Sequence, residues 1–216
     1  MENACAPYQF ALSTRAGTES VSHLLRALTD LDPEFTVVSV NGIGAYDLIR
    51  RRAMLTKLHS LPKASAFLPF VKLSYGQPSK YWWRDDTGKR HEIRQGEGGE
   101  QGDPLMSALY SLGQHDALEA INRQLLEKEH LFAYLDDIYV VCKPDRAQAV
   151  FELIERTLSA HTGVHCNMGK TRVWNRGGVE PPGVRELGPE VWVGGAERPA
   201  EQRGVKVLGT PLGTAE

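Results

Sequence analysis

LFAYLDDIYVVC, residues 131–142, is the stretch that decides the fold. Asp136 and Asp137 stand side by side between two apolar runs, 131–135 and 138–142. Burying unpaired charge is very costly, so two ionised carboxylates are rare inside such a window. The pattern is typical of two buried strands joined by a tight turn whose aspartates share a cation. Paired aspartates held at a hairpin tip are what a magnesium-dependent phosphoryl-transfer enzyme requires.

Length and composition limit the other possibilities. The 216 residues suit one domain or slightly more, and 41% hydrophobic residues are ordinary for a globular protein. The net charge of -2 predicts weak nucleic-acid binding by this chain alone, because phosphate contacts dominate such affinity. The three cysteines show no paired spacing, which favours a reducing compartment. Without a signal-peptide pattern or an apolar run of roughly 20 residues, we expect a soluble, intracellular protein and no membrane contact.

Hydrophobic periodicity and turn signals predict the order of helices and strands. Helices are expected over 18–31, 46–59, 66–75, 103–124 and 144–163. Asp103 and Pro104 are expected to cap the fourth helix, and Pro69 to interrupt the third. Strands are expected at 36–40, 164–167, 171–174 and 205–208, with hairpins over 80–94 and 131–142. Residues 177–204, rich in Gly and Pro, predict a long irregular insertion with one strand-like patch at 191–193.

The element order indicates the fold class. Helices and strands segregate without regular alternation of strand and helix, which favours an α+β fold with an antiparallel sheet flanked by helices. In a split β-α-β arrangement, the strand at 36–40 ends beside the turn of Asp136 and Asp137. Asn41, which follows that strand, is therefore expected to be the third member of a metal site.

Six blocks of sequence, taken in order, resemble the reverse transcriptases of non-LTR retrotransposons and group II introns. They are 9–18 (loosely), VVSVNGIGAYDLIR at 37–50, QGDPL at 101–105, YLDD at 134–137, NMGKT at 167–171 and LG at 208–209. Each block alone is weak, but the ordered set is specific and covers nearly the whole chain. The resemblance implies a polymerase palm without a thumb. Its parts would be partial fingers at 1–35, the palm at 36–176, the insertion at 177–204 and the start of a primer-grip-like segment at 205–216.

The resemblance also implies a metal site and a catalytic acid. Asp136 and Asp137 would bind magnesium, or manganese in its place, with Asn41 at the third position. The ions would activate the primer 3′ hydroxyl and stabilise the leaving oxygen. Lys170 would protonate the leaving pyrophosphate as a general acid.

Four further residues would bind the incoming nucleotide by the same resemblance. Tyr46 would lie under its sugar as a steric gate. Gln101 and Gly102 would face the nascent base pair, where glycine lets the backbone come close. Arg15 would contact the triphosphate. The implied partners are an RNA template, a DNA primer and deoxynucleoside triphosphates.

The chain departs from the family pattern at the metal site. The family's first catalytic aspartate falls on Asn41, which has the same shape without the charge, and hard divalent cations bind through carboxylates. Asp47 matches a second acid that does not bind metal. Glu100 stands where the family has a basic residue, and Leu12-Ser13 where it often has Phe-Arg. We therefore predict impaired template-directed DNA synthesis. The alternatives are a non-catalytic retroelement-derived remnant that binds nucleic acid or a protein partner, and an unstable relic without a role.

Other conspicuous side chains are expected to be structural. The tryptophans at 82–83 are expected to pack within a sheet rather than stack on bases, and the arginines at 50–52 to form a solvated helix face. His161, His165 and Cys166 lack a fourth ligand at a fitting spacing, so we do not expect them to bind a metal.

Overall fold

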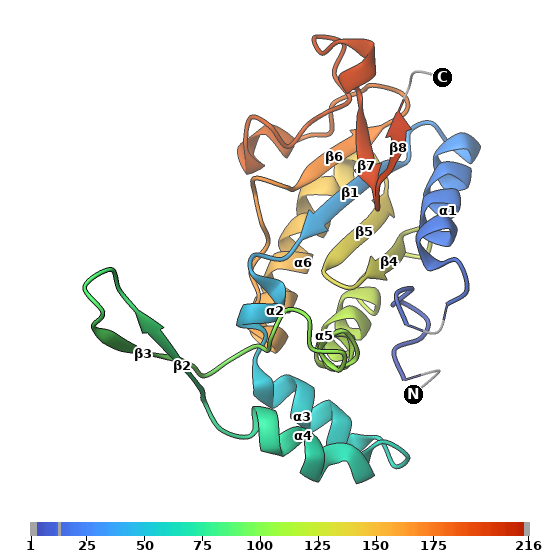
Figure 1. Ribbon diagram of the computed structural model, residues 1–216. Helices are drawn as coiled ribbons and strands as arrows, with labels where there is room; N and C mark the ends of the chain where they lie inside the picture. Colours follow the sequence, from blue (N-terminus) through green and yellow to red (C-terminus); the bar gives the residue numbers. More distant parts are fainter. Residues whose placement is uncertain (1–3, 13, 214–216) are drawn as a thin grey trace.

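The computed structural model describes residues 4–12 and 14–213. A four-stranded antiparallel sheet with the order β4-β5-β1-β6 forms its centre (Figure 1). The strands are β1 (Thr36–Asn41), β4 (His130–Tyr134), β5 (Asp137–Cys142) and β6 (Arg172–Asn175). Asn41 pairs with Asp137 across β1 and β5, as the split β-α-β arrangement predicts. The expected α+β class with an antiparallel sheet and flanking helices is confirmed.

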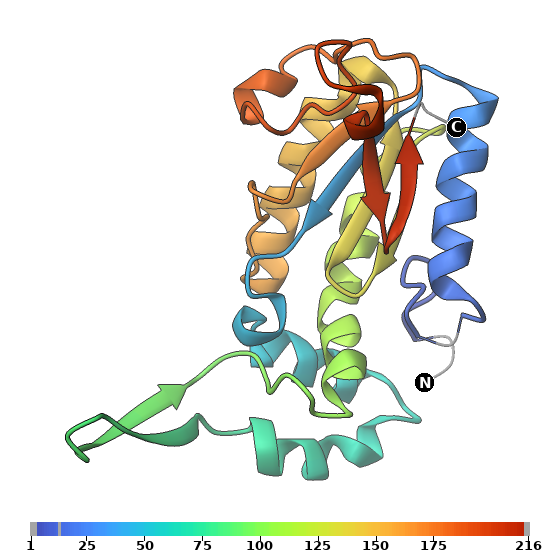
Figure 2. The same ribbon diagram turned by 45° about the horizontal axis from the view of Figure 1, so that its top comes forward.

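Each face of this sheet is covered by different elements. On one face, Val38 and Val40 of β1 pack with α5 (Met106–Asn122) and α6 (Ala147–Thr162). On the other face, Val37 packs with α1 (Gly17–Leu31) and with the hairpin of β7 (Gly204–Val207) and β8 (Thr210–Gly213). Successive side chains of a strand point to opposite faces, which is why one valine run supplies both cores. Figure 2 shows the β7–β8 hairpin in front of the sheet and α6 behind it.

A second, helical core lies next to the sheet. It joins α5 to α3 (Arg51–Ser60) and α4 (Leu68–Tyr75), with Met54, Leu58 and Leu109 among its buried side chains. Gly113 permits this close packing, because a Cβ at that position would lie 2.9 Å from both the Ile49 and the Met54 side chains.

The predicted hairpin over 80–94 is confirmed as β2 (Ser79–Arg84) and β3 (Arg90–Gln95). The two strands form a sheet of their own that projects from the molecule (Figures 1 and 2). Trp82 is 55% exposed and Trp83 54% exposed. The expectation that these tryptophans pack inside a sheet is therefore wrong, since the hairpin has no second layer to pack against.

Three helix boundaries differ from the expectation. The helix expected over 46–59 is divided into α2 (Ala45–Leu48) and α3, because Arg50 is extended and its N–H donates to the Thr162 carbonyl at 2.8 Å. Pro69 does not interrupt a helix but lies in the first turn of α4, where its missing N–H has no consequence. The next helix begins at Met106, after a turn in which Asp103 Oδ1 accepts the Leu105 N–H at 2.8 Å.

One expected strand needs correction, and the insertion packs on the sheet. Residues 164–167 form only an isolated bridge between Cys166 and Gly42, because the chain turns directly after it. The patch at 191–193 is buried and forms an isolated parallel bridge between Trp192 and Val173 of β6, with two backbone hydrogen bonds of 2.7 and 3.0 Å. Residues 177–204 are thus docked on the sheet edge through the patch that the sequence indicates. The remaining short helices are η1 (Ser65–Phe67), η2 (Pro144–Arg146), η3 (Val184–Leu187) and η4 (Ala200–Gln202).

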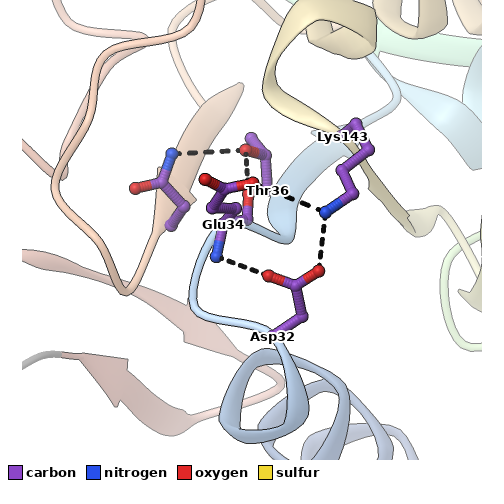
Figure 3. Close-up of polar contacts among 5 residues, drawn as sticks. Asp32, Glu34, Thr36 and Lys143 are labelled. Atoms are coloured by element: carbon purple, nitrogen blue, oxygen red, sulfur yellow. Dashed lines mark hydrogen bonds and ion pairs between the residues drawn. The ribbon is translucent and has the colours of Figure 1, made fainter.

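Polar contacts hold Thr36 at the start of β1, and the loop before it, to the chain on both sides (Figure 3). Lys143, directly after β5, donates to Asp32 at 2.6 Å and lies 3.5 Å from Glu34. On the other side, Asn175 of β6 donates to the Thr36 hydroxyl at 3.2 Å. These contacts hold the register at the end of the sheet opposite Asn41. In the part of the chain that the structure describes, no helix is both long and apolar enough to cross a membrane.

Candidate functional site

The aspartate pair lies in a tight turn that a distant residue holds in place. Tyr134 and Asp137 close the β4–β5 ladder, so Leu135 and Asp136 form the loop. Leu135 has a φ of +53°, a conformation that non-glycine residues seldom adopt. The buried side chain of Gln9 accepts the Leu135 N–H at 2.7 Å and donates to the Leu135 carbonyl at 3.3 Å. The side-chain amide of Gln9 therefore forms hydrogen bonds with both the N–H and the carbonyl of Leu135.

Asn41 contacts both aspartates. Its Nδ2 donates to Asp136 Oδ2 at 2.8 Å and to Asp137 Oδ1 at 3.1 Å. An amide oxygen turned towards two carboxylates would be repelled, so the network requires the nitrogen in this position. The three side chains expected at the metal site are thus brought together, with the Asn41 amide between the carboxylates.

The electrostatics of the turn reflect this arrangement. Burial raises the pKa of Asp137 above its usual value, and the charge of Asp136 raises it further. The Asn41 hydrogen bond and the ammonium of Lys170 oppose that shift. Burial, together with the charge of Asp136, also raises the pKa of Tyr110 well above its usual value. The two carboxylates therefore form a local negative centre that the Lys170 ammonium offsets only in part, since the pKa of Asp137 stays raised.

The donor set fits a hard divalent cation only in part. Asp136 and Asp137 converge on one N–H₂ group, so their oxygens could also converge on a cation such as Mg²⁺. Asn41 adds no oxygen in its observed orientation. Among the described residues, no cluster of three or more His, Cys, Asp or Glu side chains is placed to hold a metal. The site therefore offers two carboxylates to a cation and an amide where a third carboxylate would be needed.

Tyr46 lies beside this centre. Its hydroxyl is 3.1 Å from the Ser107 hydroxyl, and its ring centroid is 5.1 Å from that of Tyr110. Burial raises the pKa of Tyr46, the Ser107 hydrogen bond opposes this shift, and the charge of Asp136 adds to it. The glycine-rich loop at 96–99 packs on α2, the short helix that contains Tyr46. The Gly98 and Gly99 N–H groups donate to the carbonyls of Ile49 and Tyr46 at 2.7 and 2.9 Å.

The other expected nucleotide-binding residues are exposed. Gln101 and Gly102 lie in the turn before α5, and Gly102 has a φ of +98° with open space where a Cβ would point. Close backbone approach instead occurs at Gly98, whose added Cβ would lie 2.2 Å from the Asp47 carbonyl. Arg15 is exposed near the start of α1, and Ser13 lies outside the described residues. Among the residues that the structure describes, no hydrogen bond or ion pair joins Arg15 or Gln101 to the aspartates.

Lys170 is carried to the site by the loop after α6. The Ile43 N–H donates to His165 O at 2.8 Å, and the Asn167 N–H donates to Asn41 O at 2.7 Å. These bonds fix the loop against the end of β1. Lys170 is exposed and close enough to lower the pKa of Asp137.

Several residues that shape the site were missed from the sequence. Gln9 and Gln114 form a buried amide pair, with Gln9 Nε2 donating to Gln114 Oε1 at 3.2 Å. Arg51 is buried instead of solvated, and it donates to Gly98 O at 2.8 Å and Gln77 O at 2.6 Å. No local pattern marks these contacts, which join segments far apart in the chain. The three glycines within residues 96–99 were the only feature of the sequence that indicated close backbone packing.

His165 and Cys166 have a structural partner. Glu155 of α6 is 2.7 Å from His165 Nδ1 and accepts the Cys166 N–H at 2.6 Å. Burial, and then the nearby Glu155, raise the pKa of the Cys166 thiol, which makes it a poor thiolate ligand. These contacts explain both side chains without a bound metal.

Residues 3–212 match the family described as reverse transcriptase (RNA-dependent DNA polymerase). The chain therefore belongs to the reverse transcriptase family. No curated protein matches it.

Solved structures support the same fold. A telomerase of Candida tropicalis without bound ligand matches 73% of this chain with a TM-score of 0.57 and 14% identity. A telomerase of Candida albicans, in complex with a fragment of telomeric RNA, matches 73% with a TM-score of 0.54 and 15% identity. At these identities the likeness shows the fold alone. The chain spans about a third of each telomerase chain, 32% and 31%.

Proposed function

We propose that this domain performs template-directed DNA synthesis weakly, because its metal site has two carboxylates and an amide. The observation that carries the proposal is the double contact of Asn41 Nδ2 with Asp136 and Asp137. The amide partly offsets the negative charge that would otherwise attract a divalent cation. We also propose kinship with the non-LTR retrotransposon and group II intron type, supported by the order of the six blocks.

The roles proposed for the residues of the site are those that the resemblance implies. Asp136 and Asp137 would hold Mg²⁺ or Mn²⁺, which supplies charge stabilisation for phosphoryl transfer when bound. Tyr46, beside the aspartates, would limit the space under the nucleotide sugar. Lys170 would deliver a proton to the leaving pyrophosphate, since its ammonium already acts on Asp137. Gln101, Gly102 and Arg15 would have to close on the nucleotide from their exposed positions, with an RNA template and a DNA primer as partners.

Extension of a DNA primer on an RNA template tests the proposal. Asn41→Asp should raise the extension rate by about 10-fold or more, because a charged contact contributes about 1.5–3 kcal/mol. Asn122→Asp is the matched control, since it adds the same charge at the far end of α5 and should leave the rate unchanged. Asp136→Asn in the Asn41→Asp background should abolish the gain.

A second readout separates metal binding from other effects of Asn41→Asp. Mg²⁺ should raise the melting temperature of the variant clearly more than that of the natural chain, because a ligand that binds only the folded state stabilises it. Equal extension and equal Mg²⁺ response in both proteins would refute a limiting role for Asn41.

The same contact also favours a second candidate, a non-catalytic domain that binds nucleic acid. Asn41 satisfies both aspartates without a cation, so the fold does not depend on metal at this turn. Nucleic-acid binding that is unchanged by EDTA, with no extension by the Asn41→Asp variant, would support this reading over the first.

A further inference from the structure

The β2–β3 hairpin is an arm with a firmly anchored base. Arg51 of α3, 5% exposed, donates to Gln77 O at 2.6 Å before β2, to Oγ of Ser79, the first residue of β2, at 2.9 Å, and to Gly98 O at 2.8 Å after β3. Its backbone N–H also donates to Glu97 at 2.6 Å. One guanidinium therefore fixes both ends of the arm, which projects from the body of the molecule (Figure 2).

The two faces of the arm differ in chemistry. The register pairs Trp82 with Glu92 and Trp83 with His91, and alternate residues point to opposite faces. One face carries Ser79, Tyr81, Trp83, His91, Ile93 and Gln95. The other, which we call the basic face, carries Lys80, Trp82, Arg84, Arg90, Glu92 and Arg94. The only acid of the basic face, Glu92, is paired with Arg94.

The basic face presents an aromatic ring beside a cation. The guanidinium carbon of Arg90 lies 4.2 Å from the centroid of the Trp82 ring, and Trp82 remains 55% exposed. Aromatic rings and arginine planes stack on unpaired bases, while guanidinium groups bind phosphate. A single polynucleotide strand offers both groups at once, and paired bases do not expose their faces to such a ring.

The distribution of charge over the chain also favours a polynucleotide as the ligand of the basic face. Residues 79–95 contain five Lys or Arg and three Asp or Glu, a balance of +2, so the rest of the chain carries -4. Asp85, one of the three acids, is occupied within the turn by Thr87, Lys89 and His91. A polyanion is thus attracted to the arm and repelled by the rest of the molecule.

We propose that the basic face of the β2–β3 hairpin binds a single-stranded polynucleotide, with Trp82 stacking on a base and the surrounding cations contacting phosphates. The assignment goes beyond the proposed function, because it needs neither the aspartates nor a metal ion. In a reverse transcriptase domain, this surface would hold an unpaired stretch of nucleic acid outside the site at Asn41.

Fluorescence anisotropy with labelled oligo(dT) and oligo(rU) of about 20 nucleotides, in EDTA and low salt, tests the assignment. Trp82→Ala should weaken binding by roughly 5-fold to 100-fold, as expected for loss of one stacked base. Arg90→Gln should weaken it in the same direction. Trp83→Ala is the matched control, because it removes an equally exposed tryptophan from the opposite face and should change affinity less than about 2-fold. Thermal melting checks that each variant is folded.

Other results would overturn the assignment. Equal losses in Trp82→Ala and Trp83→Ala, or no loss in either, would remove the basic face as the binding surface. Tighter binding of a duplex of equal length would show recognition of paired nucleic acid. A dimer that dissociates in Trp83→Ala, without binding of either oligonucleotide, would make the arm a contact between copies of this chain. Comparison of oligo(dT) with oligo(rU) identifies the strand type. Failure of Asn41→Asp to extend a primer would leave the binding result unaffected.

Discussion

At the scale of single residues, Asn41 decides how the aspartate pair is neutralised. Two carboxylates at adjacent positions repel one another, and burial already raises the pKa of Asp137. A third carboxylate would increase that repulsion until a cation bound. The amide instead gives each aspartate a hydrogen bond in the absence of any ion. We therefore expect Asn41, compared with an aspartate at the same position, to lower the affinity for a cation and to stabilise the metal-free turn.

Gln9 provides a second test at this scale. Gln9→Leu removes both hydrogen bonds to Leu135 and the bond that Gln9 donates to the buried Gln114 amide oxygen, so it should reduce the free energy of unfolding by about 1–3 kcal/mol. Urea unfolding measures the change. Gln124→Leu, which removes an exposed glutamine near the end of α5, should stay within about 0.5 kcal/mol of the natural chain. Equal stability of the two variants would show that the turn holds its shape without Gln9.

At the scale of elements, sequence patterns predicted what is local and missed what is long-range. The hairpin at 131–142 and the helix at 18–31 were predictable because alternation and helical spacing are written within each segment. The break between α2 and α3 was not, since it depends on a bond from Arg50 to Thr162, over a hundred residues away. The trio of Asn41, Asp136 and Asp137 was predicted by register, whereas its support by Gln9 was not. The roles of those residues remain predictions.

The turn of the β2–β3 hairpin should respond to acid. The Thr87 hydroxyl, followed by His91, lowers the pKa of Asp85 from 3.8 to about 2. Because the folded pKa lies below the unfolded one, the stabilisation is present above pH 3.8 and is lost as the pH falls towards 2. Amide NMR signals of Thr87 and Lys89 should shift over that range, at a higher pH than that at which the whole domain unfolds.

Two variants separate this turn from general acid effects. Asp85→Asn should produce the shifted Thr87 and Lys89 signals at neutral pH, because the amide accepts these bonds less strongly than a carboxylate. Asp86→Asn, at the exposed neighbouring position, should leave them in place. Unshifted signals in Asp85→Asn would show that the turn does not depend on the carboxylate charge.

At the scale of the whole molecule, charge separation should set how the domain binds a primed template. The chain carries -2 overall, with +2 on residues 79–95. The arm is therefore expected to supply most of the electrostatic attraction, and we expect a dissociation constant of about 10⁻⁶ M or weaker at physiological salt. If the four cations of the basic face each neutralise one phosphate of a single strand, the logarithm of affinity should fall with the logarithm of salt with a slope of about -3.

Titrations of primed template over a series of KCl concentrations measure this slope. Lys80→Gln with Arg84→Gln should make it shallower by about 1 to 1.5, because two of the phosphate contacts are removed. Lys128→Gln, which removes an exposed charge from the loop before β4, should leave the slope unchanged. Tight binding at physiological salt with a flat slope would contradict the localisation of charge on the arm. A steep slope that the Lys80 and Arg84 changes do not alter would place the phosphate contacts on another surface.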